Sequence, residues 1–155
     1  MLDEGKKKLD EKGYSEAAIK YQLGNALTLP YPNNHFDIYT VSFGLRNMVD
    51  FQKALNEAYR VLKQSGRIYI LDLSRIQNPT FKALYDLYTL KLFGPISKML
   101  FEESKQKHYQ YLGESAPTFL NQEELRSYMV KAGFTKVDYR NLNNGIVCLH
   151  QGIKA

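Results

Sequence analysis

The stretch RIYILDL at residues 67–73 decides the fold that we expect for this chain. After Arg67 it is a run of aromatic, β-branched and other apolar residues that only Asp72 breaks, and Ser65-Gly66 precedes it. Such a run is typical of a strand that is buried on both faces of a parallel sheet. Residues 50–63 come before it, with apolar side chains at helical spacing and Asp50 as a fair N-cap. A helix that leads into a buried strand predicts an α/β unit.

The residues further upstream extend this unit. FDIYTVSF at 36–43 has strand composition and ends at Gly44, and a shorter strand is expected at 19–23. Between these strands lies a proline-containing loop, and residues 1–12 read as a helix that Gly13 ends. The order helix, strand, strand, helix, strand favours a layered α/β sheet.

The downstream half adds helices and a hairpin. Residues 79–112 are expected to be helical in two or three pieces, with an interruption at Gly94-Pro95. A further helix should run from the N-cap Asn121 to Gly133. Strands at 136–142 and 145–153 flank Asn143-Asn144-Gly145, which is a good hairpin signal. The sheet should therefore close on an antiparallel hairpin.

Composition excludes several classes of function. The 155 residues are 44% hydrophobic and 24% charged, which suits one globular domain. The net charge of +5 is dispersed, and 6–8 is the only basic run, so we expect no nucleic-acid partner. Cys148 is the single cysteine and the three histidines are isolated, so we expect no metal site. No apolar run reaches the length of a membrane span, and we expect a soluble or peripheral protein.

Three sets of motifs give the sequence a specific resemblance. The first is LPYP at 29–32 and FD at 36–37, followed by SFGLRN at 42–47. The second is RVLKQSGR at 60–67 through LDLS at 71–74. The third is YQYLGES at 109–115 with GIV at 145–147 and HQG at 150–152. Together they resemble the ubiquinone/menaquinone biosynthesis C-methyltransferase family over essentially the whole chain.

The resemblance implies a fold and also shows departures. It implies a class I S-adenosylmethionine-dependent methyltransferase (Rossmann-like) fold, N-terminally truncated and ending in an antiparallel hairpin. The glycine-rich first loop and the acidic residue after the second strand of the family would precede Met1, so residues 1–155 should be the C-terminal portion of one methyltransferase domain. Gln64 and Ser65 stand where the family has Pro-Gly, and we expect Gly66 to supply any positive φ.

The resemblance also implies where the cofactor S-adenosylmethionine would bind. Asn25 and the backbone of Ala26 would meet its adenine, although an asparagine in this position can simply form a turn. Ser42 and Phe43, at the carboxyl end of their strand, would lie near its methionine part. The alternative is a strand end that holds no ligand.

Arg46 is the candidate catalytic residue that the resemblance implies. A guanidinium can orient a quinol oxyanion or hold a water that takes the ring proton, but it is a poor base by itself. The alternative is a surface or capping arginine. Tyr109, Tyr111 and Glu114 are candidates for the substrate pocket, with packing as their alternative role. No metal is expected.

The implied function is C-methylation of a polyprenyl methoxy-benzoquinol in ubiquinone biosynthesis. The implied location is the matrix side of the mitochondrial inner membrane, as a peripheral protein. The implied partners are the quinol substrate, the membrane, other ubiquinone-biosynthesis enzymes in a multi-subunit complex, and a second copy in a homodimer. The apolar stripe beginning at Phe81 could admit the isoprenoid tail, and a core helix is the alternative. A non-catalytic truncated form that acts as an interaction module of that complex is the alternative function.

Overall fold

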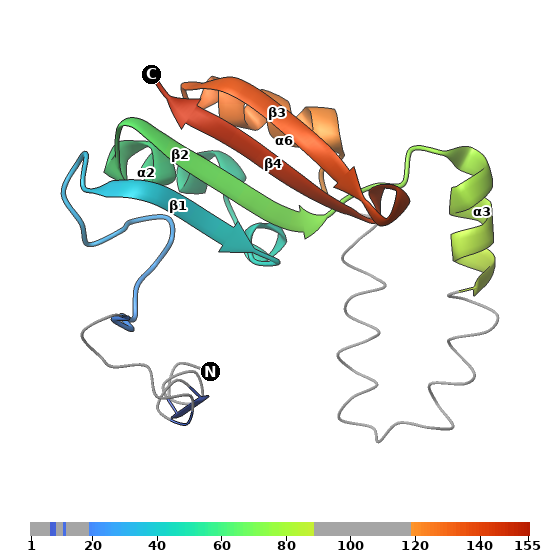
Figure 1. The fold of residues 1–155 in the computed structure, drawn as a ribbon, viewed down its shortest axis with the longest axis horizontal. Helices are drawn as coiled ribbons and strands as arrows, with labels where there is room; N and C mark the ends of the chain where they lie inside the picture. The colour runs from blue at the N-terminus through green and yellow to red at the C-terminus, as the bar shows by residue number, and fades with distance from the viewer. Residues whose placement is uncertain (1–6, 9–10, 12–18, 89–118) are drawn as a thin grey trace.

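The computed structural model describes residues 7–8, 11, 19–88 and 119–155. Its strands form one four-stranded sheet in the order β1-β2-β4-β3 (Figure 1). β1 pairs with β2 in parallel, and the ladders β2–β4 and β3–β4 are antiparallel. In chain order the elements are β1 (Phe36–Ser42), η1 (Leu45–Asn47), α2 (Phe51–Val61), β2 (Leu62–Leu73), α3 (Pro79–Leu87), α6 (Gln122–Lys131), β3 (Phe134–Leu142), η3 (Asn143–Gly145) and β4 (Val147–Lys154). The expected mixed sheet ending in a hairpin is confirmed.

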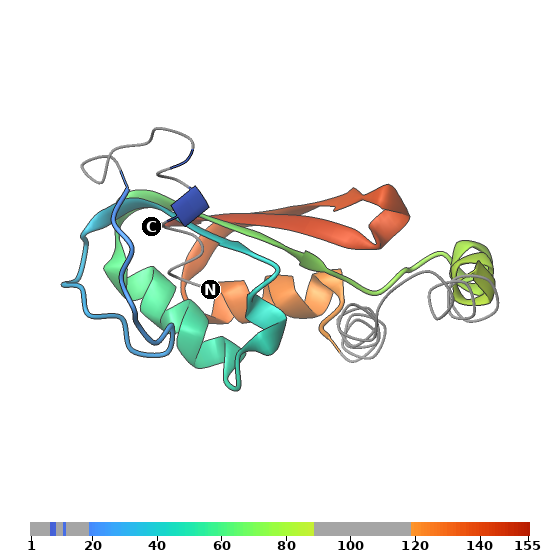
Figure 2. The same cartoon turned by 90° about the horizontal axis from the view of Figure 1, so that it is seen from below.

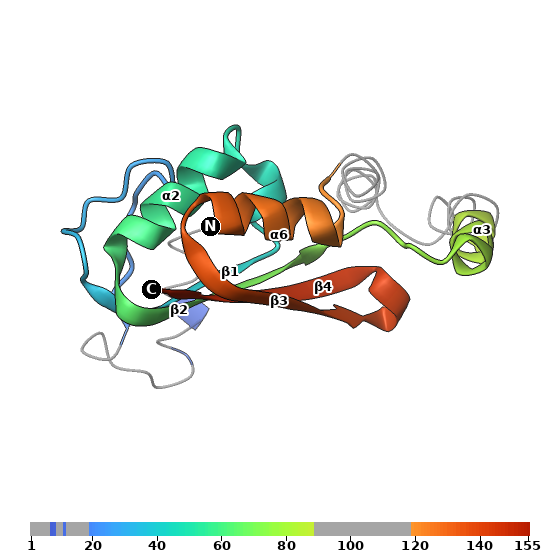
Figure 3. The ribbon, with the colours of Figure 1, turned by 90° about the horizontal axis from the view of Figure 1, so that it is seen from above.

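Helices α2 and α6 lie side by side on one face of this sheet, as both Figure 2 and Figure 3 show. Apolar side chains between the two layers form the core, among them Leu55, Ala58, Leu62, Ile68, Ile70, Leu125, Met129 and Phe134. Along β2, Ile68, Ile70 and Asp72 are buried, whereas Tyr69 and Leu71 between them are only partly buried. The expectation of a strand buried equally on both faces is therefore wrong for the described residues, because α2 and α6 cover one face only.

Local capping explains where the two core helices begin. The Asp50 side chain accepts a hydrogen bond of 2.9 Å from the Lys53 N–H, as expected for the N-cap of α2. Asn121 and Glu124 form a reciprocal capping box at the start of α6. Gly133 follows α6 with a φ of +103°, a conformation that a side chain would strain. These three sequence signals are confirmed.

Residues 64–66, which lie within the first part of β2, differ from the expectation. Ser65 has the positive φ, 61°, and Gly66 does not. A Cβ on Gly66 would instead lie 2.7 Å from the Lys63 carbonyl oxygen and 3.2 Å from that of Asp37. Gly66 is thus required for the close approach of two backbones, and the left-handed position is left to a serine.

Residues 19–23 do not form the expected strand. They have no regular structure, and Leu23 is 84% exposed. In the described part of the chain no strand lies beside them to complete a backbone ladder, and a lone extended segment gains no such hydrogen bonds. Of the expected helix at 1–12, residues 7, 8 and 11 are helical and the others lie outside the described residues. Of the helices expected over 79–112, α3 is confirmed and residues 89–112 lie outside as well.

The hairpin β3–β4 forms at the expected place. Leu142 pairs with Val147, so four residues connect the strands. Asn143, Asn144 and Gly145 all have positive φ, at 48°, 55° and 89°. Asparagine and glycine tolerate this conformation better than other residues, so the sequence fits the turn.

Ser65→Gly should stabilise the chain, because glycine adopts a positive φ without the steric cost that serine carries. We expect the free energy of unfolding to rise by about 1 kcal/mol, and Tm by about 2–4 °C. The neighbouring substitution Gly66→Ala is the matched control and should destabilise, since its Cβ would meet backbone oxygens. Urea and thermal unfolding measure both; a less stable Ser65→Gly variant would contradict the assignment.

Candidate functional site

The carboxyl ends of β1 and β2 lie at the same edge of the sheet, because the strands are parallel and Ser42 pairs with Leu71. Ser42 is exposed there. Phe43 follows with a φ of 51° and donates its N–H to the Leu71 carbonyl at 2.8 Å, and the residue is 41% exposed. The turn η1 then carries Arg46 back toward β2. The structure thus brings Ser42, Phe43 and Arg46 to the edge where open α/β sheets bind ligands.

Arg46 forms a buried ion pair with Asp72. Its Nη1 donates to Asp72 Oδ1 at 2.7 Å, and its backbone N–H approaches Asp72 Oδ2 at 3.3 Å. The two side chains are only 7% and 2% exposed. A buried carboxylate requires such a partner, so this pair holds η1 against the end of β2. An acidic residue within the apolar run 67–73 was the sequence signal for it, but sequence reasoning gave Asp72 no role.

One donor of this arginine is left without a partner in the part of the chain that the structure describes. Arg46 Nε is buried and has no hydrogen-bond partner among the described residues. Its guanidinium carbon lies 5.8 Å from the centre of the exposed Phe43 ring. Paired with a carboxylate, the guanidinium is a fixed positive hydrogen-bond donor and cannot serve as a base. What this group can do chemically is stabilise a negative oxygen or hold a water.

Asn25 and Ala26 lie in a turn of their own. Asn25 Oδ1 accepts the Leu27 N–H at 2.9 Å, and the Asn25 carbonyl accepts the Thr28 N–H at 2.9 Å. The turn-forming role of Asn25 is therefore present in the structure. The side chain is exposed, and its amide donor has no partner in the part of the chain that the structure describes. Within that part, no hydrogen bond joins this turn to Ser42 or Phe43.

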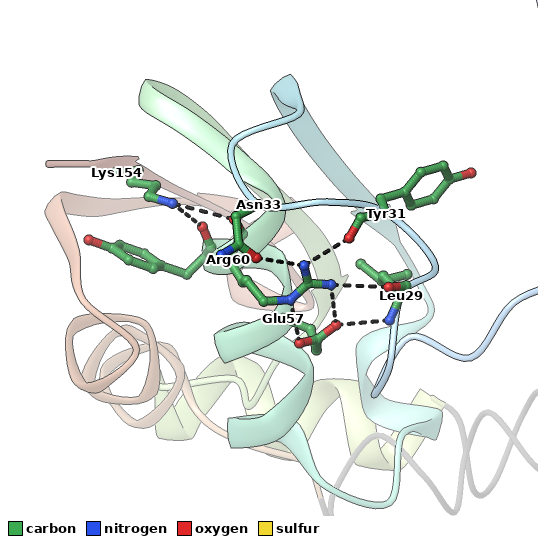
Figure 4. A network of polar contacts seen from close by, with 7 residues as sticks. Leu29, Tyr31, Asn33, Glu57, Arg60 and Lys154 are labelled. Carbon is green, nitrogen blue, oxygen red and sulfur yellow. Dashed lines mark hydrogen bonds and ion pairs between the residues drawn. The ribbon is translucent and has the colours of Figure 1, made fainter.

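Sequence reasoning missed the polar network that holds residues 29–33, which we call the strap (Figure 4). Arg60 of α2 donates to the carbonyl oxygens of Leu29 and Tyr31 at 3.0 and 2.8 Å. Glu57, one turn earlier, accepts the Leu29 N–H at 2.8 Å. The Arg60 guanidinium, as its main cause, lowers the pKa of Glu57 below its ordinary value. Arg60 stands in the motif RVLKQSGR, but the motif alone did not indicate this contact.

Lys154, at the end of β4, makes further contacts next to this network. Its Nζ donates to the carbonyl oxygens of Tyr59 and Leu62, both at 2.8 Å, and to Asn34 Oδ1 at 2.9 Å. Burial lowers the pKa of this amine. The ammonium thereby satisfies carbonyls at the C-terminal end of α2, where a positive charge is favourable.

His150, part of the motif HQG, is buried in β4. Its Nε2 lies 2.9 Å from the Gln122 carbonyl oxygen at the start of α6, and its Nδ1 is buried without a partner among the described residues. Burial lowers the pKa of this imidazole, although the bond to Gln122 opposes the shift. His150 is thus a neutral core residue. Tyr109, Tyr111 and Glu114 lie outside the described residues.

Known proteins are similar to this chain over nearly its whole length. Residues 1–154 match the family described as the ubiE/COQ5 methyltransferase family. A mitochondrial 2-methoxy-6-polyprenyl-1,4-benzoquinol methylase of Gallus gallus is 46% identical over 154 residues, which are 99% of this chain and 49% of that protein. The protein of the same name from Homo sapiens is 42% identical over 99% of this chain and 46% of its own length. The ubiquinone/menaquinone biosynthesis C-methyltransferase UbiE of Shewanella sediminis is 40% identical, over 99% and 60%. The chain spans about half the length of the curated relatives it matches.

Solved structures share the fold. The YcgJ protein from Bacillus subtilis superposes with a TM-score of 0.66 at 20% identity, covering 99% of this chain and 78% of that one. A SAM-dependent methyltransferase from Aquifex aeolicus gives a TM-score of 0.62 at 15% identity, over 99% and 63%. The chain therefore has the class I methyltransferase fold that the sequence predicts. In the described residues, no helix has the length and apolar character needed to cross a membrane.

Stability should fall as the pH drops below about 6.5, the ordinary pKa of histidine. In that range the unfolded chain takes up more proton at residue 150 than the folded chain does, because folding lowers the pKa of His150. His150→Gln should remove this part of the pH dependence, and the exposed His35→Gln should retain it. Urea unfolding at about pH 7.5 and about pH 5.5 measures the difference. Equal losses in the parent and in His150→Gln would contradict a neutral buried His150.

Proposed function

We propose a methyl-transfer function for this chain, which belongs to the ubiE/COQ5 methyltransferase family. Residues 1–155 would form the C-terminal portion of a single methyltransferase domain that uses S-adenosylmethionine. The reaction would be C-methylation of a polyprenyl methoxy-benzoquinol in ubiquinone biosynthesis. The observation that carries this proposal is the family match over residues 1–154, and the exposed carboxyl edge at Ser42 and Phe43 supports it.

The described residues offer groups that could bind the adenine and the methionine part of the cofactor. The exposed Asn25 amide keeps a free donor for the adenine rim, beside the backbone of Ala26. Ser42 and Phe43 offer an exposed hydroxyl and an exposed ring at the strand end, where the methionine part would lie. The cofactor, when bound, supplies a methyl group on a positively charged sulfur. These residues would bind and orient it, and placement should supply most of the rate.

Arg46 would act on the quinol through its free donor. Nη1 is held by Asp72, and Nε, a buried donor without a partner in the described residues, is our candidate for donating to a ring oxygen or to a water. Donation to the oxygen stabilises its ionised form, which raises the electron density of the adjacent ring carbon. A water held by Nε could accept the proton that the ring loses. The guanidinium would orient groups and would not exchange a proton, because an arginine side chain keeps its charge in proteins.

The proposed substrate follows from the names of the relatives, and the proposed partners follow from the resemblance of the sequence. Tyr109, Tyr111 and Glu114 would line the quinol pocket. The exposed Leu84 and Leu87 of α3, 60% and 47% exposed, would contact the isoprenoid tail or the membrane surface. We place the protein in the mitochondrion, peripheral on the matrix side of the inner membrane, with other ubiquinone-biosynthesis enzymes. A second copy of the chain, in a homodimer, is a further proposed partner.

A chimera tests the activity directly. In the Gallus gallus relative, this chain would replace the region of 154 residues that it matches. We expect the purified chimera to methylate a short-chain methoxy-benzoquinol with S-adenosylmethionine, detected by mass spectrometry, because the replaced half carries the residues proposed above. The unaltered relative is the positive control. A folded chimera without activity would refute the enzymatic proposal and favour the interaction module.

Arg46→Ala in the same chimera should lower kcat by about a hundredfold or more, as for removal of an oxyanion donor, with a smaller change in the KM for S-adenosylmethionine. Arg46→Lys keeps the charge beside Asp72 and should lose less activity. Arg67→Ala, at an exposed residue of β2, is the control for loss of a positive charge. Turnover equal to the parent in Arg46→Ala would remove Arg46 from the mechanism.

A further inference from the structure

We propose that Glu57 and Arg60 are positioning residues that fix the turn at Asn25 and Ala26 through the strap. The inference rests on the proposed function, in which this turn binds the adenine of S-adenosylmethionine. Neither side chain would touch the cofactor. Their effect would pass through the backbone of Leu29, three residues beyond Ala26, which the pair holds on α2.

The hydrogen bonds of Arg60 are saturated. Nε donates to Glu57 Oε1 at 2.8 Å, Nη1 to the Tyr31 carbonyl and to Asn33 Oδ1 at 2.8 Å each, and Nη2 to the Leu29 carbonyl at 3.0 Å and to Glu57 Oε2 at 2.9 Å. A guanidinium has five N–H donors, and each has an acceptor here. A lysine at this position has three donors without the planar fork and could not hold all of these groups.

Both backbone polar groups of Leu29 have side-chain partners on α2, in place of the partners that a neighbouring strand would supply. Its N–H donates to Glu57 Oε2 and its carbonyl accepts from Arg60 Nη2. In a sheet, these two backbone groups would be satisfied by an adjacent strand. The two side chains of one helix turn replace that strand, because residues 57 and 60 lie on the same face of α2.

The two residues that follow the strap are also bonded to the end of α2. The Asn34 and His35 N–H groups donate to the carbonyls of Arg60 and Val61 at 3.1 and 2.8 Å, and Lys154 holds the Asn34 side chain. β1 begins at the next residue, Phe36. From Leu29 to β1 the chain is therefore fixed to the C-terminal part of α2 (Figure 4).

The turn at Asn25 has weaker attachments. Its own backbone and side-chain hydrogen bonds are internal, to Leu27 and Thr28. Leu27 packs at the margin of the core, and residues 19–24 on its other side have no regular structure. Leu29 is hence the first residue after the turn whose backbone is bonded to a helix. If Leu29 is released, the Asn25 amide and the Ala26 backbone lose a defined position.

The test uses the 155-residue chain with Arg60→Lys and with Glu57→Gln. Amide hydrogen exchange by NMR should be faster by about tenfold or more at Leu29 in both variants, with little change at Leu149 in β4. Lys63→Gln is the matched control, because Lys63 forms an exposed pair with Asp37, at 47% and 79% side-chain exposure. It should leave the exchange at Leu29 unchanged. Acceleration that is equal at Leu29 and Leu149 would show a general loss of stability and overturn the proposal.

A titration with S-adenosylmethionine supplies the functional readout. In the parent, ligand at about millimolar concentration should shift the side-chain amide signal of Asn25 and the backbone signal of Ser42. In Arg60→Lys and Glu57→Gln, the ligand concentration at the midpoint of the titration should rise by about tenfold at both signals, because Asn25 and Ser42 would report the same bound ligand. Equal affinities in the variants and the parent would overturn the positioning role. A parent in which Ser42 responds and Asn25 does not would instead overturn the assignment of this turn to the cofactor.

Discussion

The pairing of β2 with two different neighbours is the constraint on which the described structure depends. β2 is parallel to β1 on one side and antiparallel to β4 on the other. A parallel neighbour requires a crossover, and α2 supplies it by packing Leu55 and Ala58 over the sheet. An antiparallel neighbour requires the chain to return, which α6 and the hairpin β3–β4 accomplish. Every described layer of the fold is thus built on this one strand.

The two ends of β2 carry different polar chemistry. Near its amino end, Arg60 donates to a backbone carbonyl of the strap, and Lys154 donates to backbone carbonyls at the end of α2. At its carboxyl end, Asp72 holds Arg46 beside the exposed Phe43. The amino-end contacts are saturated and bind only the protein itself. The carboxyl-end pair leaves one buried donor without a partner, which suits the edge where α/β proteins bind their ligands.

The chain belongs to the ubiE/COQ5 methyltransferase family, and this membership indicates a function that the geometry alone does not identify. The solved structures that superpose on the chain are at most 20% identical among those described above, so they establish the shared fold and no more. The proposed role of the carboxyl edge in methyl transfer rests on the family match. The polar network at the amino edge explains how a loop without a neighbouring strand can still have a fixed position.

The sequence by itself determined the elements and the family, because strand composition, caps and turn residues act locally. FDIYTVSF, RIYILDL, Asp50, Asn121 and the Asn143-Asn144-Gly145 turn each predicted the local structure that is observed. Only the tertiary structure decided the contacts between distant residues. It placed the positive φ on Ser65, left residues 19–23 without a strand, paired Arg46 with Asp72 and brought Lys154 to α2. The physical reason is that a buried charge or an unpaired backbone group is satisfied by whatever lies next to it in space, which spacing along the chain does not reveal.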